Sequence, residues 1–142
     1  MWFLNHGICY HNCMGRLSEF GAYEVEISDE GEYIAEFWSR GGVLHRIGKP
    51  AIIHYDPKTR AEILRVYKFD GLTHRKDGPA IEEIDPETGI VSLEEYYEKG
   101  QMHRMGKPAK ITYNPKTGNL SSIEHHEFGQ WMKLPSKFNP EP

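Results

Sequence analysis

The strongest constraint on the fold of this chain is an internal repeat of 29 residues. A Gly-x-x-His-Arg pattern begins at Gly42, at Gly71 and at Gly100, so the interval between copies is constant. A Pro-Ala pair and an Asp/Asn-Pro-x-Thr segment follow at the same interval, and no gap separates the three units. Such regularity predicts an array of equivalent units, each packed against its neighbours.

Each unit contains a turn signature between two short stretches of β-forming residues. The turns begin at Asp56, Asp85 and Asn114. Asp or Asn accepts local backbone hydrogen bonds, Pro sets φ at the second position, and Gly supplies a left-handed residue. The flanking stretches are therefore predicted to form β-hairpins. The first copy has Arg60 where the others have Gly. Because a left-handed Arg costs about 1 kcal/mol, we expect that turn to differ locally.

The connection between units, Gly-x-x-His-Arg-x-x-x-Pro, is predicted to be a longer loop. It is too long for a two-residue turn and too rich in Gly and Pro for a helix. No apolar period of 3.6 residues persists for a dozen residues, so we expect almost no helix. The predicted fold is all-β: an antiparallel meander of about four β-hairpin repeats with degenerate capping ends. It forms a single twisted or curled sheet whose concave side supplies the core.

The repeat domain is predicted to span residues 1–133. Residues 33–133 carry the regular repeats, and residues 1–32 form a divergent N-terminal unit. At the other end Met132 and Lys133 stand where His and Arg are expected, and a Pro-rich tail follows at 134–142. Atypical first and last units are expected, because the end faces of an array have no neighbour to cover them.

Composition limits the classes of function. The net charge of −4 and the pI near 6.1 argue against general binding of nucleic acid or of an anionic membrane surface. The longest apolar run is only a few residues, too short to span a bilayer, and the first residues do not resemble a signal peptide. With only two cysteines, a disulfide framework is not expected. These features predict a cytoplasmic protein.

The repeats resemble a known type. The hairpin units, and above all the Gly-x-x-His-Arg-x-x-Gly-Pro-Ala segment at 71–80, are similar to MORN-type β-hairpin repeats found in proteins of bacteria, phages and large viruses. The resemblance covers about residues 33–133. It implies a scaffolding or interaction role.

The His-Arg pairs are the first candidate site. If each unit contributes two strands, the pairs lie about 9–10 Å apart along one edge of the sheet and form a row of cations, the His-Arg rim. Arg suits phosphate or carboxylate groups, which predicts anion binding. The alternative is that each side chain bonds loop carbonyls and holds the repeats in register. The rim comprises His45, Arg46, His74, Arg75, His103 and Arg104.

An aromatic ladder is the second candidate site. Trp38, Tyr67 and Tyr96 occupy equivalent positions one period apart, and His125 takes the fourth. Cross-strand aromatic pairs stabilise sheets, so these side chains are expected in the core. If they are partly exposed, they form a platform for a base or for a partner's side chain.

The sequence carries no strong enzymatic or metal signal. His6, Cys9, His11 and Cys13 are metal-ligand residue types, but zinc sites favour a second ligand pair elsewhere in the chain, and none exists. There is no Gly-rich phosphate loop, no Gly-x-Ser-x-Gly and no His-Glu-x-x-His. We therefore expect neither catalysis nor a cofactor.

The function predicted from the sequence is non-catalytic binding of a partner protein through the sheet and the His-Arg rim. If the chain comes from a phage or virus, it would inhibit or sequester a host factor in the host cytoplasm. The main alternative is a protein that sequesters a nucleotide or another anionic phosphate compound against the rim. A third is an enzyme or metal-binding protein that uses the N-terminal Cys/His cluster. Open sheet edges also favour a homodimer.

Overall fold

The computed structural model describes residues 8–11, 24–29 and 34–132, with side chains over 34–132. All regular elements within these ranges are β-strands. These residues therefore contain no helix that could cross a membrane. The first strands are β1 (Ile8–His11), β2 (Glu24–Asp29), β3 (Ile34–Arg40), β4 (Val43–Leu44), β5 (Ile52–Tyr55), β6 (Glu62–Val66), β7 (Lys68–Phe69) and β8 (Leu72–Thr73). The others are β9 (Ile81–Ile84), β10 (Val91–Glu95), β11 (Tyr97–Glu98), β12 (Gln101–Met102), β13 (Lys110–Tyr113), β14 (Leu120–Glu124), β15 (His126–Glu127) and β16 (Gln130–Trp131).

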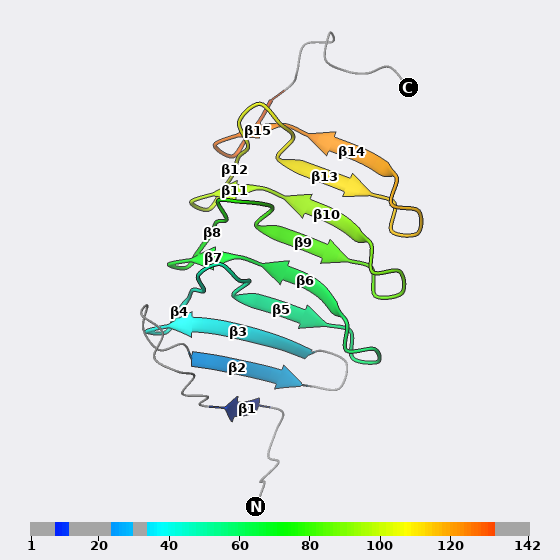
Figure 1. Ribbon diagram of the computed structural model, residues 1–142. Helices are drawn as coiled ribbons and strands as arrows, with labels where there is room; N and C mark the ends of the chain where they lie inside the picture. Colours follow the sequence, from blue (N-terminus) through cyan, green and yellow to red (C-terminus); the bar gives the residue numbers. More distant parts are fainter. Residues whose placement is uncertain (1–7, 12–23, 30–33, 133–142) are drawn as a thin grey trace, which may run out of the picture.

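The strands form an antiparallel meander, as predicted (Figure 1). One sheet runs in the order β1-β2-β3-β5-β6-β9-β10-β13-β14, and β4 pairs with the end of β3. Three separate two-stranded hairpins, β7–β8, β11–β12 and β15–β16, continue from the second long strand of each unit. The large sheet stays open, with β1 and β14 as its edges.

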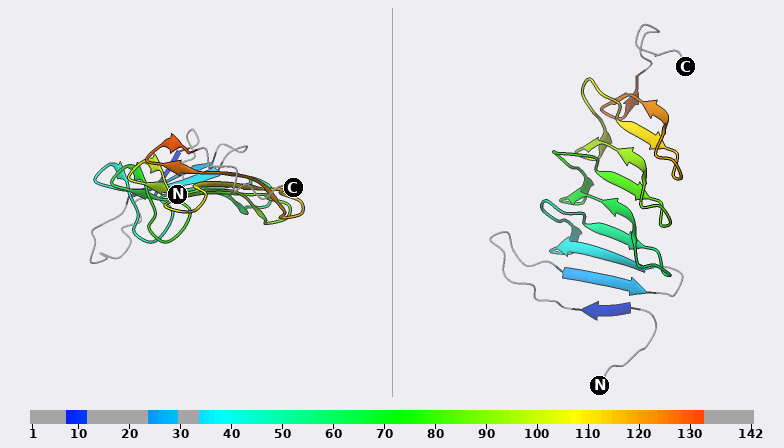
Figure 2. Two further views of the ribbon diagram at one scale, coloured as in Figure 1. Left: turned by 90° about the horizontal axis from the view of Figure 1, so that it is seen from above. Right: turned by 45° about the vertical axis from the view of Figure 1, so that its right-hand side comes forward.

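The 29-residue period is visible in the structure. The elements β5 to β8 recur as β9 to β12 and as β13 to β16, each displaced by one period. In every unit the Asp/Asn-Pro turn joins the two long strands at one end of the sheet, which we call the turn side. The short hairpin and the loop after it lie at the opposite end, the hairpin side (Figure 1). Figure 2 shows the stack from two further directions.

The three Asp/Asn-Pro turns share one geometry, so the expectation that the first turn differs is wrong. Arg60 adopts a φ of 63°, close to the 71° of Gly89 and the 74° of Gly118. The amide of Arg60 donates to the carbonyl of Asp56 over 2.8 Å, and the two glycine turns show the same bond at the same length. The Asp56 carboxylate also accepts the Thr59 amide at 2.7 Å. These bonds offset the roughly 1 kcal/mol cost of a left-handed Arg.

The connection between units differs from the long loop predicted from the sequence. Its first part is a tight two-residue hairpin. Asp70 and Gly71 have φ of 47° and 79° and join β7 to β8. Two central residues of positive φ define a type I′ turn, whose twist matches that of the flanking strands. The equivalent pairs of the other units, Gly41–Gly42, Lys99–Gly100 and Phe128–Gly129, also have positive φ.

The buried core is thin. The repeated Pro-Ala pair supplies one fully buried residue in each unit, namely Ala51, Ala80 and Ala109. Their backbones bridge neighbouring strands: the amide of Ala80 donates to Glu95, and its carbonyl accepts from Tyr67. A sheet with so few buried apolar side chains depends on contacts between adjacent units. The other buried apolar residues in the described part of the chain are Ile34, Ala35, Ile53 and Val66.

Candidate binding surface on the hairpin side

Each arginine of the His-Arg rim lies over an aromatic ring of its own unit. The distance from the guanidinium carbon to the ring centroid is within the range of a cation–π contact. The planar guanidinium therefore covers one face of each ring. The pairs are Arg46 over Trp38 at 3.5 Å, Arg75 over Tyr67 at 3.9 Å and Arg104 over Tyr96 at 3.6 Å.

The same guanidinium groups close the loop that follows each hairpin. In every unit Nη1 donates a hydrogen bond to the carbonyl of the proline four residues further on. A donor that carries a charge makes a stronger bond than a neutral one. The bonds run from Arg46 to Pro50 at 3.1 Å, from Arg75 to Pro79 at 3.0 Å and from Arg104 to Pro108 at 3.2 Å.

The histidines of the rim link one unit to the next. Each Nδ1 accepts a backbone N–H from the type I′ turn of the following hairpin, 25 residues further along the chain. His45 and His103 are buried, and their rings pack against Phe69 and Phe128 at centroid distances of 4.7 and 4.2 Å. The accepted bonds come from Asp70 to His45 at 3.0 Å, from Lys99 to His74 at 3.3 Å and from Phe128 to His103 at 3.3 Å.

The rim therefore has a structural role in the array. All three pairs lie on the hairpin side, in the row that the period predicts. Their side chains close loops and join units, which is the register-holding alternative considered from the sequence. Binding of an anion or of a partner by the same side chains stays a prediction.

The aromatic ladder is half-buried, and carboxylates accept hydrogen bonds from two of its members. Trp38 Nε1 donates to Glu36 over 3.1 Å, and the Tyr96 hydroxyl donates to Glu94 over 3.3 Å. The Tyr55 hydroxyl also bonds Glu36, at 2.9 Å. Burial, helped by Glu36, raises the pKa of Tyr55 well above its usual value. Trp38 and Tyr96 thus contribute to an ordered polar network.

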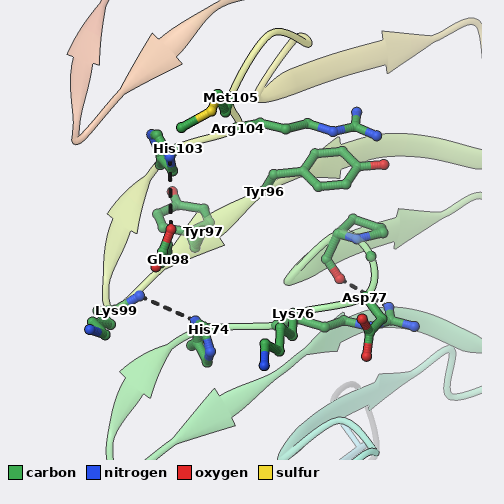
Figure 3. A pocket seen from close by; sticks show the side chains of 13 residues that line it. His74, Lys76, Asp77, Tyr96, Tyr97, Glu98, Lys99, His103, Arg104 and Met105 are labelled. Atoms are coloured by element: carbon green, nitrogen blue, oxygen red, sulfur yellow. Dashed lines mark hydrogen bonds and ion pairs between the residues drawn. The ribbon is translucent and has the colours of Figure 1, made fainter.

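Two hollows lie between successive loops on the hairpin side. The larger has a volume of about 930 Å³ and the smaller about 370 Å³. Figure 3 shows the larger, with Tyr96 and Arg104 on one side and Lys76 and Asp77 on the other. Both hollows are lined by Arg75, Lys76 and Asp77, so these residues form the wall between them.

Exposed apolar side chains gather on the hairpin side, which the sequence analysis did not foresee. Val43 and Leu72 are one period apart and are 46% and 50% exposed. Phe69 pairs with Leu72 across the hairpin and is 47% exposed. The signal that was missed is the Asp-Gly pair between Phe69 and Leu72, which is typical of a two-residue hairpin. Further exposed large apolar residues on this side are Ile47, Met105, Phe128, Trp131 and Met132.

The N-terminal cluster of metal-ligand residue types cannot be placed. His6 and Cys13 lie outside the described residues, and Cys9 and His11 are described only as backbone of β1. Within the described part of the chain, no three His, Cys, Asp or Glu side chains lie together in a way that could hold a metal ion.

Comparisons with protein-family models, with curated proteins and with solved structures find no match to this chain. Its function must therefore be inferred from its own residues.

Proposed function

We propose that this chain is a non-catalytic binding protein whose hairpin side engages a partner protein. The observation that carries the proposal is the distribution of exposed large apolar side chains: of the ten within residues 34–132, eight lie on the hairpin side, and Leu120 and Ile123 lie elsewhere. Exposed apolar groups gathered in this way, and aromatic and Met side chains in particular, are typical of protein interfaces.

The apolar side chains form a strip that crosses unit boundaries. A Cβ atom placed on Gly71 would lie 3.2 Å from Val43 Cγ1, and one on Gly100 would lie 3.4 Å from Leu72 Cδ2. Val43 and Leu72 thus rest on the backbone of the hairpin that follows each of them. The strip therefore offers a partner a surface that spans several units, as stacked arrays do.

The resemblance of the repeats to a known type extends the proposal. The Gly-x-x-His-Arg-x-x-Gly-Pro-Ala pattern supports a MORN-like repeat, for which a scaffolding or interaction role is implied. In a phage or virus, such a protein would act as an inhibitor that sequesters a host factor in the host cytoplasm. The partner would then be a host protein.

A second candidate function is the sequestering of a small anionic ligand, such as a nucleotide. The observation in its favour is the 930 Å³ hollow, whose lining includes Arg75 and Arg104. Against it, both guanidinium groups already lie on tyrosine rings and donate to proline carbonyls. An anion would have to compete with these contacts, so the geometry favours the protein partner.

Capture experiments with matched variants test the proposal. The full chain, a Phe69→Ser/Leu72→Ser variant and a Leu120→Ser/Ile123→Ser variant are immobilised and exposed to an extract of the native cellular background. We expect the wild type and the Leu120→Ser/Ile123→Ser control to retain the same protein, and the hairpin variant to lose it while keeping its strand signal in circular dichroism. Equal capture by all three would contradict the proposal.

A further inference from the structure

The strand β14 forms an edge of the large sheet, whereas its equivalents in the two preceding units do not. β6 also pairs with β9, and β10 also pairs with β13, so each of them has a strand on both sides. Among the described residues, β14 pairs with β13 alone. The first four residues of β14 are exposed, while every residue of β6 and β10 is buried or half-buried. The exposure of β14 follows from the lack of a next strand.

The backbone at this edge carries hydrogen-bonding groups suited to one more strand. The Tyr67 amide donates to the carbonyl of Ala80 in the following unit over 2.8 Å. The Tyr96 amide donates to Ala109 in the same way and over the same distance. His125 is the next equivalent residue, and no described residue accepts a hydrogen bond from its amide. Open backbone groups at a sheet edge are a template for pairing with another strand.

The edge lacks the charges that usually prevent such pairing. Natural edge strands are protected by lysine, proline or inward-pointing charges, and also by bulges. β14 has the sequence Leu-Ser-Ser-Ile-Glu, so its one charge is at its last residue. Its register shift also occurs in the pairs β5–β6 and β9–β10, so that irregularity belongs to the repeat. Ile123 occupies the position of Arg65 in β6 and Glu94 in β10, so the edge strand is apolar where the covered strands are charged.

The sequence of β14 is complementary to a second copy of itself. In an antiparallel pair, facing residues share one face of the sheet, so a two-fold axis must pass beside a single residue. An axis at Glu124 would set two carboxylates opposite each other, which is destabilising. An axis at Ser122 would set Leu120 against a carboxylate. An axis at Ile123 sets isoleucine against isoleucine and Glu124 against Ser122, so it avoids both conflicts.

The register at Ile123 also continues a row of apolar side chains. Ile123 faces Ile111 across the pair β13–β14. Because facing residues of adjacent strands point to the same side of a sheet, two copies would bring four isoleucines into one row. Ile123 is 40% exposed in the single chain, and the pairing would cover it. Leu120 and Ile123 are also the two exposed apolar residues of 34–132 that the proposed function leaves unused.

We propose that two copies of this chain associate through β14, in antiparallel register around Ile123, and so join their large sheets into one. A contact between β14 and β1 of another copy would leave free edges and build a filament, whereas the contact of β14 with itself closes at two copies. Because the paired strands are antiparallel, the hairpin sides of the two copies lie at opposite ends of the joined strands. The dimer therefore presents the proposed binding strip twice, and the inference does not depend on the proposed function.

Sedimentation velocity of the full chain tests the inference. A strand pair of this length makes a small interface and a weak association, so the concentration series extends to about 0.5 mM. We expect a reversible equilibrium between monomer and dimer. Ile123→Lys should stay monomeric, because two lysines then face each other, while the control Leu72→Lys, on the hairpin side, should dimerise like the wild type. A monomeric wild type, species larger than a dimer, or equal loss of the dimer in both variants would overturn the inference.

A mixture of oppositely charged variants locates the two-fold axis. Ile123→Glu alone should also be monomeric, because two carboxylates then face each other. Mixed in equal amounts, Ile123→Lys and Ile123→Glu should form a dimer, since each lysine meets a glutamate of the other variant. Circular dichroism should show the strand signal of the wild type in both variants. A mixture that stays monomeric would overturn the inference, because residue 123 would then not face residue 123 of the second copy.

Discussion

The guanidinium carbon of Arg75 lies 3.9 Å from the centre of the Tyr67 ring, at the point where β6 bends into the short hairpin. Its Nη1 also holds the carbonyl of Pro79 at 3.0 Å. One side chain therefore joins the end of a strand to the loop that leads back into the sheet. The equivalent contacts of Arg46 and Arg104 repeat this arrangement in the neighbouring units.

Replacing Arg75 with Ala is expected to lower the free energy of unfolding by about 1–3 kcal/mol, because a cation–π contact and a charged hydrogen bond are both lost. Thermal denaturation should show a decrease of several degrees in Tm. Lys76→Ala, one residue away but exposed, should leave Tm unchanged. An Arg75→Ala protein that melts like the wild type would argue against the structural role.

Replacing His45 with Leu is expected to uncouple two adjacent units locally. Nδ1 of His45 accepts the amide of Asp70, and the loss of one such hydrogen bond costs about 0.5–1.5 kcal/mol. Amide hydrogen exchange should accelerate at Asp70 and much less at Gly100, whose amide donates to Thr73 one unit further along. Unchanged exchange at Asp70 would contradict the role assigned to the histidine.

Gly71 is expected to tolerate substitution less well than Gly89. Both have a positive φ, so Ala strains the backbone at either position. At Gly71 the added Cβ would also lie 3.2 Å from Val43 Cγ1, whereas nothing lies within 4 Å at Gly89. Gly71→Ala should therefore reduce Tm more than Gly89→Ala, and Val43→Ala should recover part of that extra loss. Equal decreases in Tm at the two glycines, or no recovery in the Gly71→Ala/Val43→Ala variant, would show that backbone strain alone sets the loss of stability.

The Asp-Pro turns should make stability depend on pH in the acid range. Backbone and hydroxyl hydrogen bonds from Thr59 and Thr88 hold the pKa values of Asp56 and Asp85 below their usual 3.8. A carboxyl whose pKa is lower in the folded state stabilises the fold above pH 3.8, and the contribution disappears as the pH falls through the lower value. Asn114 makes the same turn without a charge.

The double variant Asp56→Asn/Asp85→Asn should keep the turns and lose this part of the acid sensitivity. Urea unfolding between pH 6 and pH 2 measures the difference. The wild type and the variant should converge in stability at the acid end of the range. A variant with an unaltered pH profile would show that the two carboxylates play no part.

The repeat made the architecture predictable, because identical residues at a fixed interval must occupy equivalent positions in one sheet. The Asp/Asn-Pro turns and the row of His-Arg pairs follow from that interval. Arg60 misled the prediction, since local propensity disfavours a left-handed Arg, and only the hydrogen bonds of the folded turn offset that cost. The hairpin at Asp70–Gly71 was hidden inside a longer Gly/Pro-punctuated segment.

The contacts of the rim could not be chosen from the sequence. Arg75 is equally suited to a phosphate, a carboxylate, an aromatic face or a carbonyl, and the choice depends on where Tyr67 and Pro79 lie in space. The partner of each histidine is a backbone amide 25 residues away, which carries no residue-type signal. Exposure of Phe69 and Leu72 depends on the small hairpin standing apart from the large sheet.

The equivalence of the units is tested most directly by removing one of them. Deletion of residues 71–99 joins Asp70 to Gly100 and restores the Asp-Gly turn, so every retained unit keeps its neighbours' contacts. We predict that the shortened chain gives the same strand signal in circular dichroism and a cooperative thermal transition at lower Tm. Deletion of residues 71–85, about half a period, serves as the control and should abolish folding. If both shortened chains were unfolded, the account of stacked equivalent units would be contradicted.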